Sequence, residues 1–180
     1  RAANLLAGRR LYDVQNIPAS GARAVSSGGA SVDATARMDG LLACDLLLVV
    51  AGGEPIGFHN PAVFAWLRRM ARQQTRLGGV SGGPVILALA GLMAGRRMTV
   101  HWEHAEGLSR HDPALLIERG IYVMDRDRLT CGGGLAATDM MHALIAQRHG
   151  RAFAQRFGVA DQKFWKRVER PSIVNNGIRH

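Results

Sequence analysis

A short apolar stretch interrupted by glycines, residues 77–88, constrains the fold of this chain more than any other. It runs to Val80, places a serine between glycines, and continues as an apolar segment from Pro84. Glycine allows a tight turn and a close approach of other groups, and proline suits the first position of a helix. We therefore predict a strand, a sharp turn at Ser81 and a helix over residues 85–93, which together place a small polar side chain at the carboxyl edge of a sheet. The helix start there should also offer free amide groups to an anion or a carbonyl oxygen.

The same order of strand, glycine turn and helix recurs elsewhere in the chain. Residues 45–50 are an almost unbroken apolar run that ends in a Gly-Gly turn, a pattern typical of a parallel strand covered on both faces. Residues 129–131 lead into three glycines and a helix predicted over 136–149. At least three such repeats predict an α/β fold, a three-layer, doubly wound and mostly parallel sheet. Gly53 and Glu54 should then lie at the carboxyl edge, where open α/β sheets bind ligands.

Weaker patterns predict the remaining elements. A helix should be capped by Asn60, with Pro61 at its first position. Arg68, Arg72 and Arg76, spaced by four residues, should share its solvent-exposed face. Further helices are expected over residues 1–8, 103–109 and 152–159, and strands over 11–17, 22–25, 98–101 and 121–124.

Composition excludes several classes of protein. A length of 180 residues and an apolar content of 47% suit one folded domain, and no run approaches the roughly 20 apolar residues that cross a bilayer. The net charge of +9 permits nucleic-acid binding, but the sequence has no helix-turn-helix, zinc-finger or basic-zipper motif. Cys44 and Cys131 are expected to be buried thiols, which suggests a reducing, cytoplasmic compartment.

The turn also matches G-x-S-x-G, the nucleophile elbow of serine hydrolases. A serine hydroxyl needs a general base within hydrogen-bond reach, and His101 is a candidate base by its position. His101 and His104 flank Glu103, but a strand-to-helix junction should separate the two imidazoles, so we expect neither a metal site nor a cofactor. Trp102 is expected either to face a cationic ligand or to pack in the core. Glu54 and Glu103 are expected either to pair with an ammonium or guanidinium group or to be simply solvated.

With these segments placed, the chain resembles the N-terminal domain of AraC-type transcriptional regulators that have a class I glutamine-amidotransferase-like (PfpI-type) fold. The segments that carry the resemblance are DLLLVVAGG (45–53), GVSGG (79–83), LAGLMAGRR (89–97), TVHWEH (99–104), DRDRLTCGGG (125–134) and ATDMM (137–141). The sequences of the TVHWEH and DRDRLTC segments are similar to those of regulators of arginine, choline and carnitine catabolism.

The resemblance implies a flavodoxin-like sensor domain over residues 1–160 and a basic linker over 161–180. It also implies a homodimer, no membrane association, and DNA binding through a C-terminal helix-turn-helix domain that this sequence does not contain. The expected effector is an amine, betaine or amino acid, bound by Gly53, Glu54, Ser81, Gly82, His101, Trp102 and Glu103. Enzymes of the superfamily have cysteine at the elbow, where this chain has Ser81, and the first strand of the family is expected to precede Arg1.

Three functions therefore remain open at this point. The preferred one is a non-catalytic sensor domain. The second is a small serine hydrolase or PfpI-type enzyme that uses Ser81 as nucleophile and His101 as base. The third is a dimerisation scaffold with a vestigial pocket.

Overall fold

The computed structural model describes residues 1–26, 28–38 and 42–156. The chain forms two compact units, a larger one over Val14–Met141 and a smaller one that joins Arg1–Asp13 to the chain from His142 onward. The predicted linker over 161–180 lies outside the described residues. Within the described residues, no helix has both the length and the apolar character required to cross a membrane.

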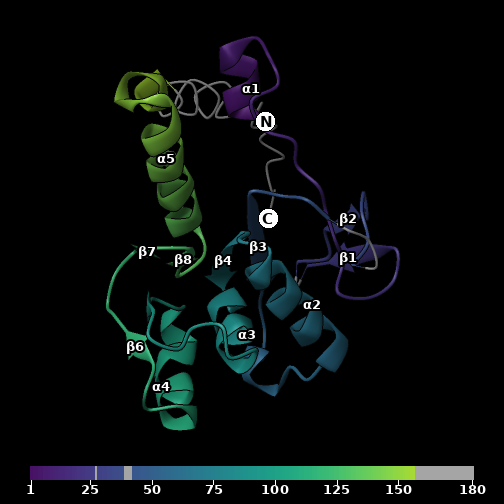
Figure 1. Ribbon diagram of the computed structural model, residues 1–180, viewed down its shortest axis with the longest axis vertical. Helices are drawn as coiled ribbons and strands as arrows, with labels where there is room; N and C mark the ends of the chain where they lie inside the picture. Colours follow the sequence, from purple (N-terminus) through teal and green to yellow (C-terminus); the bar gives the residue numbers. More distant parts are fainter. Residues whose placement is uncertain (27, 39–41, 157–180) are drawn as a thin grey trace, which may run out of the picture. The chain divides into compact units, whose positions relative to one another are not determined.

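The larger unit is built on a four-stranded sheet whose order is β3–β4–β8–β7 (Figure 1). β3 (Leu46–Ala51), β4 (Arg76–Ser81) and β8 (Arg128–Cys131) run parallel to one another. β7 (Tyr122–Asp125) pairs antiparallel with β8. The predicted fold class, a mostly parallel sheet with helices, is confirmed.

The register of the sheet places Ser81 at its carboxyl edge, as predicted. Val50 pairs with Val80, and Val80 pairs in turn with Cys131. Ser81 is the last residue of β4 and pairs with Ala51, the last residue of β3. The turns after β3, β4 and β8 therefore leave the sheet on the same side.

Helices α2 (Pro61–Arg72) and α3 (Gly83–Leu89) lie beside β3 and β4 (Figure 1). The 3-10 helix η1 (Pro55–Gly57) follows β3, and α4 (Trp102–His111) contacts it. The largest core cluster includes Val63, Phe64, Trp66, Leu67 and Met70 of α2, Val85, Ile86 and Leu87 of α3, and Leu77 of β4. Two short sheets complete this unit: β1 (Arg23–Val25) pairs antiparallel with β2 (Ser31–Asp33), and β5 (Arg97–Met98) pairs parallel with β6 (Leu116–Ile117).

The cap of α2 is confirmed, whereas the predicted arginine face is wrong. The Asn60 side chain accepts hydrogen bonds from the amides of Ala62 and Val63, at 3.1 and 3.2 Å. The helix ends at Arg72, and Gln74 has a φ of 62°, so the chain turns there and Arg76 begins β4. The three arginines therefore do not lie on one helix.

Three other expected elements differ from the structure. Residues 11–17 are not a strand, because Asn4 accepts the amides of Leu11 and Tyr12 in place of a ladder partner. Helix α3 ends at Leu89 and does not reach residue 93. Just after its end, Gly91 has a φ of 74°, and its amide donates to the Ala88 carbonyl. Of the strand predicted over 98–101, only Met98 belongs to a strand, β5, and the Thr99 amide donates to the Thr130 hydroxyl at 2.9 Å.

The smaller unit contains α1 (Ala2–Ala7), which ends at left-handed Gly8 as predicted. Its core consists of Ala3, Ile145 and Ala154. Tyr12 Oη lies 2.9 Å from His149 Nε2. α5 (Leu135–His149) crosses the boundary between the units. Residues 151–156 are also helical, and the rest of the predicted helix 152–159 lies outside the described residues.

The DRDR segment forms the turn between β7 and β8, as predicted, and a network of ion pairs connects this turn to the loop after α3. Asp127 accepts from Arg96 Nε at 2.9 Å and from Arg128 Nη1 at 2.7 Å. Arg128 is buried, and its Nε donates to the Leu92 carbonyl at 2.9 Å. Asp125 accepts the Arg97 amide at 2.8 Å. Some of the residues in this segment that carry the resemblance to AraC-type regulators therefore have a structural role.

These contacts predict a loss of stability in acid. Burial alone would raise the pKa of Asp127, but the Arg96 hydrogen bond and the Arg128 charge outweigh it, and its pKa is lowered. The hydrogen bond from the Arg97 amide likewise lowers the pKa of Asp125. A carboxyl whose folded pKa is lowered stabilises the fold above its unfolded pKa of about 3.9, and that stabilisation is lost as the pH falls through the folded pKa.

Urea denaturation at a series of pH values should therefore show stability falling below about pH 4. Asp127→Asn should reduce this fall, whereas Asp112→Asn, which lacks such an ion-pair network, should leave it unchanged. An equal acid dependence in wild type and Asp127→Asn would contradict the assignment.

Candidate functional site

The turn after β4 has the backbone strain of a nucleophile elbow. Ser81 has a φ of 60°, a left-handed conformation that is uncommon outside glycine. The next residue, Gly82, packs closely against η1, because a Cβ on it would lie 2.8 Å from Pro55 Cγ. The G-x-S-x-G pattern thus corresponds to a real elbow, in which the glycine after Ser81 allows η1 to pack closely.

Two amide groups around this elbow already donate to protein carbonyls, and whether the others bind an anion stays a prediction. Gly82 donates to the Ala51 carbonyl at 2.9 Å, and Val85 donates to the Gly82 carbonyl at 3.1 Å. Pro84 has no N–H to donate. An oxyanion hole needs donors aimed at the reacting oxygen, and the Gly82 amide is directed at a protein carbonyl instead.

Cys131 and the glycines that follow it support the elbow from the next strand. Burial raises the pKa of the Cys131 thiol, although hydrogen bonds from the Gly133 and Ser81 backbone act in the opposite direction. Gly133 has a φ of 86°, and a Cβ there would lie 2.7 Å from Ser81 Cβ. The thiol is fully buried, as predicted, whereas Cys44 is only partly buried; both are free. The sequence indicated a second glycine turn here, but not that it contacts Ser81.

His101 lies next to the elbow through its backbone. Its amide donates to the Ser81 carbonyl at 3.4 Å, and it forms the N-cap residue of α4. Its Nδ1 is buried without a hydrogen bond and lies 3.4 Å from Glu103 Oε2, close enough for an ion pair when the imidazole is protonated. Among the described residues, no hydrogen bond joins the Ser81 hydroxyl to the His101 ring.

Trp102 does not pack in the core, which was one of the two roles considered for it. Its side chain is 77% exposed at the start of α4. Its ring centroid lies 5.7 Å from that of His101. The indole is therefore available to solvent.

A cavity of about 340 Å³ lies between η1, α3 and α4. We call it the acidic cavity. Val85 and Leu108 are buried members of its lining, whereas Glu54 and Glu103 are exposed. The site thus combines an apolar base with two carboxylates. Its complete lining is Gly53, Glu54, Ile56, Val85, Glu103, His104, Gly107 and Leu108.

The acidic cavity brings together three of the seven predicted ligand contacts. Gly53, Glu54 and Glu103 line it. Ser81, Gly82, His101 and Trp102 lie outside its lining, and their roles in binding stay predictions. His104 and the apolar residues were not predicted as ligand contacts. His104 had been considered only as a metal ligand, and within the described residues no group of three His, Cys, Asp or Glu side chains could hold a metal ion.

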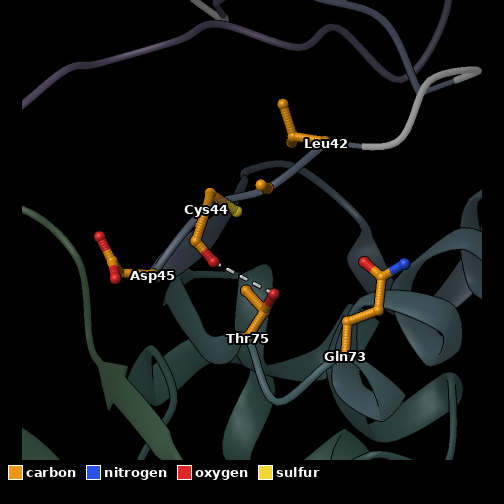
Figure 2. A pocket seen from close by; sticks show the side chains of 6 residues that line it. Leu42, Cys44, Asp45, Gln73 and Thr75 are labelled. Carbon is orange, nitrogen blue, oxygen red and sulfur yellow. Dashed lines mark hydrogen bonds between the residues drawn. The ribbon is translucent and has the colours of Figure 1, made fainter.

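A second cavity, of about 550 Å³, lies beside the amino end of β3. Figure 2 shows its lining, in which the Thr75 hydroxyl donates to the Cys44 carbonyl at 3.2 Å. The residues that line it are Leu42, Ala43, Cys44, Asp45, Gln73 and Thr75. None of the predicted ligand contacts belongs to this set, so the acidic cavity is the better candidate.

The parallel sheet and the strained elbow define the class of this protein. The sequence profile of the DJ-1/PfpI family matches residues 3–147, and the chain belongs to that family. A DJ-1 superfamily protein from Salmonella typhimurium has the same fold, with a TM-score of 0.71 at 19% identity over 91% of this chain and 86% of that one.

More similar relatives are regulators of transcription. The chain is 42% identical over 178 residues to the HTH-type transcriptional regulator GlxA of Rhizobium meliloti, covering 98% of this chain and 54% of that protein. It is 40% identical over 144 residues to the HTH-type transcriptional regulator CdhR of Pseudomonas aeruginosa, covering 80% of this chain and 43% of that protein. The chain thus spans about half the length of these relatives.

A solved structure agrees with this relationship. An AraC family transcriptional regulator from Pseudomonas putida matches with a TM-score of 0.78 at 27% identity, over 88% of this chain and 85% of that one. The predicted resemblance to AraC-type regulators with a PfpI-type domain is therefore confirmed.

Proposed function

We propose that this chain is the ligand-sensing and dimerising domain of a cytoplasmic AraC-type transcriptional regulator. DNA binding would come from a helix-turn-helix domain outside this sequence, and the chain itself would be non-catalytic. The observation that carries the proposal is the 42% identity to an HTH-type regulator along 98% of the chain. The acidic cavity gives the sensor a place to bind its effector.

The chemistry of the acidic cavity supports a small amine or amino-acid-like effector. Glu54 and Glu103 approach it from η1 and α4, two elements that contact each other. An ammonium or guanidinium group between two carboxylates forms charge-assisted hydrogen bonds. Because effector contacts would reach both elements, binding there is expected to stabilise their packing.

The hydrogen bonds of the elbow support a non-catalytic role. The Gly82 amide, on the residue after the hydroxyl, donates to the Ala51 carbonyl. Without donors for a developing oxyanion, a serine hydrolase loses a large part of its rate enhancement, about 100-fold or more for one donor.

The proposal is tested by calorimetric titration of the 180-residue chain with amines, betaines and amino acids. The double variant Glu54→Gln/Glu103→Gln should weaken binding of any ligand found by about tenfold or more, because even one hydrogen bond to a charged group contributes about 1.5–3 kcal/mol. Glu106→Gln, on the same helix as Glu103 but outside the lining, is the matched control and should bind normally. A folded chain that binds no member of the three classes would contradict the proposal and favour a vestigial pocket.

A serine hydrolase is the second candidate, and two observations favour it. Ser81 has the strained φ of an elbow nucleophile, and His101 Nδ1 lies 3.4 Å from a carboxylate that could orient the ring. A fluorophosphonate probe separates the two functions. We expect no labelling; stoichiometric labelling that is lost in Ser81→Ala would overturn the sensor proposal in favour of the hydrolase.

A further inference from the structure

The charged groups in the lining of the acidic cavity have one sign. Its ionisable members are Glu54, Glu103 and His104, and the lining includes neither lysine nor arginine. An arginine is the usual protein partner of a ligand carboxylate, because its planar fork binds both oxygens. The described side chains of this cavity can therefore pair with a cation but offer no permanent positive charge to an anion.

Two features of the backbone near the cavity limit the positive charge that it can supply. Helix α3 provides Val85 to the lining, and near its start the Gly82 amide donates to the Ala51 carbonyl and Pro84 has no N–H. Helix α4 has Glu103 in its first turn, where the carboxylate already complements the positive end of the helix dipole. A second carboxylate brought there by a ligand would be close to Glu103.

Apolar atoms complete the site. Val85 and Leu108 are 0% and 1% exposed, and Ile56 lies at the rim with 38% exposure. A volume of about 340 Å³ is at the small end of the range for ligand pockets. These features suit a compact ligand that has an alkyl body and a cationic end.

We propose that the effector is an organic cation without a carboxylate, that is, an amine, diamine or quaternary ammonium compound, and that the cavity discriminates against zwitterionic amino acids and betaines. This inference rests on the proposed sensor function and narrows its ligand class. Discrimination arises because a ligand carboxylate would be repelled by Glu54 and Glu103 and would find no cationic side chain in the lining.

The test uses three pairs of compounds that differ mainly in the carboxylate: agmatine and L-arginine, cadaverine and L-lysine, choline and glycine betaine. Each is titrated calorimetrically into the 180-residue chain at about 20 mM and about 150 mM salt, because screening reveals the electrostatic part of the discrimination. In each pair that binds, the carboxylate-free member should bind at least about tenfold more tightly than its carboxylate-bearing partner. The ratio should shrink at the higher salt concentration.

Variants of the lining locate the source of the discrimination. Glu103→Gln should bring the two affinities of a pair closer together, whereas Glu106→Gln, outside the lining on the same helix, should leave their ratio unchanged. A zwitterion that binds as tightly as its carboxylate-free partner would overturn this inference while leaving the sensor function intact. If none of the six compounds binds, this inference fails, and the wider titration with amines, betaines and amino acids tests the sensor function separately.

Discussion

Gly83→Ala is expected to lower the free energy of unfolding by about 3 kcal/mol, at the upper end of the usual cost of overpacking. Gly83 is the first residue of α3 and is buried against β3. A Cβ there would lie 2.8 Å from the carbonyl carbon of Val49 and closer still to its oxygen. Both are backbone atoms of a sheet strand, so they cannot rotate away as a flexible side chain would. The strand and the helix would have to separate.

Gly52→Ala provides the matched control for this prediction. Gly52 is exposed in the turn after β3, and a Cβ there meets no atom within 4 Å. Its substitution should change stability by no more than about 0.5 kcal/mol. Urea denaturation followed by circular dichroism measures both variants. If Gly83→Ala were as stable as Gly52→Ala, the close contact between α3 and β3 would not exist in solution.

Arg128→Met is expected to cost about 2 kcal/mol, because it removes a buried, charged donor from partly buried acceptors. The Arg128 side chain is 7% exposed, and methionine retains most of its apolar stem. The substitution removes the donor to the Leu92 carbonyl and one of the two arginine partners of Asp127. The loop after α3 and the β7–β8 turn would then be joined by Arg96, by Arg126, which donates to the Gly95 carbonyl, and by the Arg97 amide.

Arg110→Met serves as the control for the buried arginine. Arg110 pairs with Glu106 along α4, and its side chain is 74% exposed. An exposed pair of this kind contributes at most about 0.5 kcal/mol. The same denaturation experiment compares the two variants. Equal stability of Arg128→Met and Arg110→Met would show that the Arg128 network does not stabilise the fold.

The sequence determined those parts of the fold that depend on local pattern. The apolar run before Gly52, the serine between glycines and the charged turn at 125–128 each specify their own backbone, and all three form as predicted. Asn60 caps α2 because its side chain reaches amides only two and three residues away. Interactions over such short separations are visible without knowledge of the rest of the chain.

Elements that need a partner elsewhere in the chain were not determined in this way. Residues 11–17 alternate like a strand, yet a strand exists only where another strand supplies its hydrogen bonds, and Asn4 supplies two of them instead. Arg76 continues the helical spacing of the arginines, yet its amide donates to the Asp45 carbonyl at the amino end of β3. Tertiary pairing decided both cases.

The same distinction between local pattern and tertiary pairing applies to the candidate site. Sequence alone placed Ser81, Gly53 and Glu54 after strands that end at one edge, because the parallel sheet followed from pattern. Only the tertiary structure decided that Glu54 and Glu103 share a cavity with His104, and that the Gly82 amide donates to the Ala51 carbonyl. The composition of a cavity and the partner of an amide depend on distances between segments remote in sequence, and packing of the whole unit sets those distances.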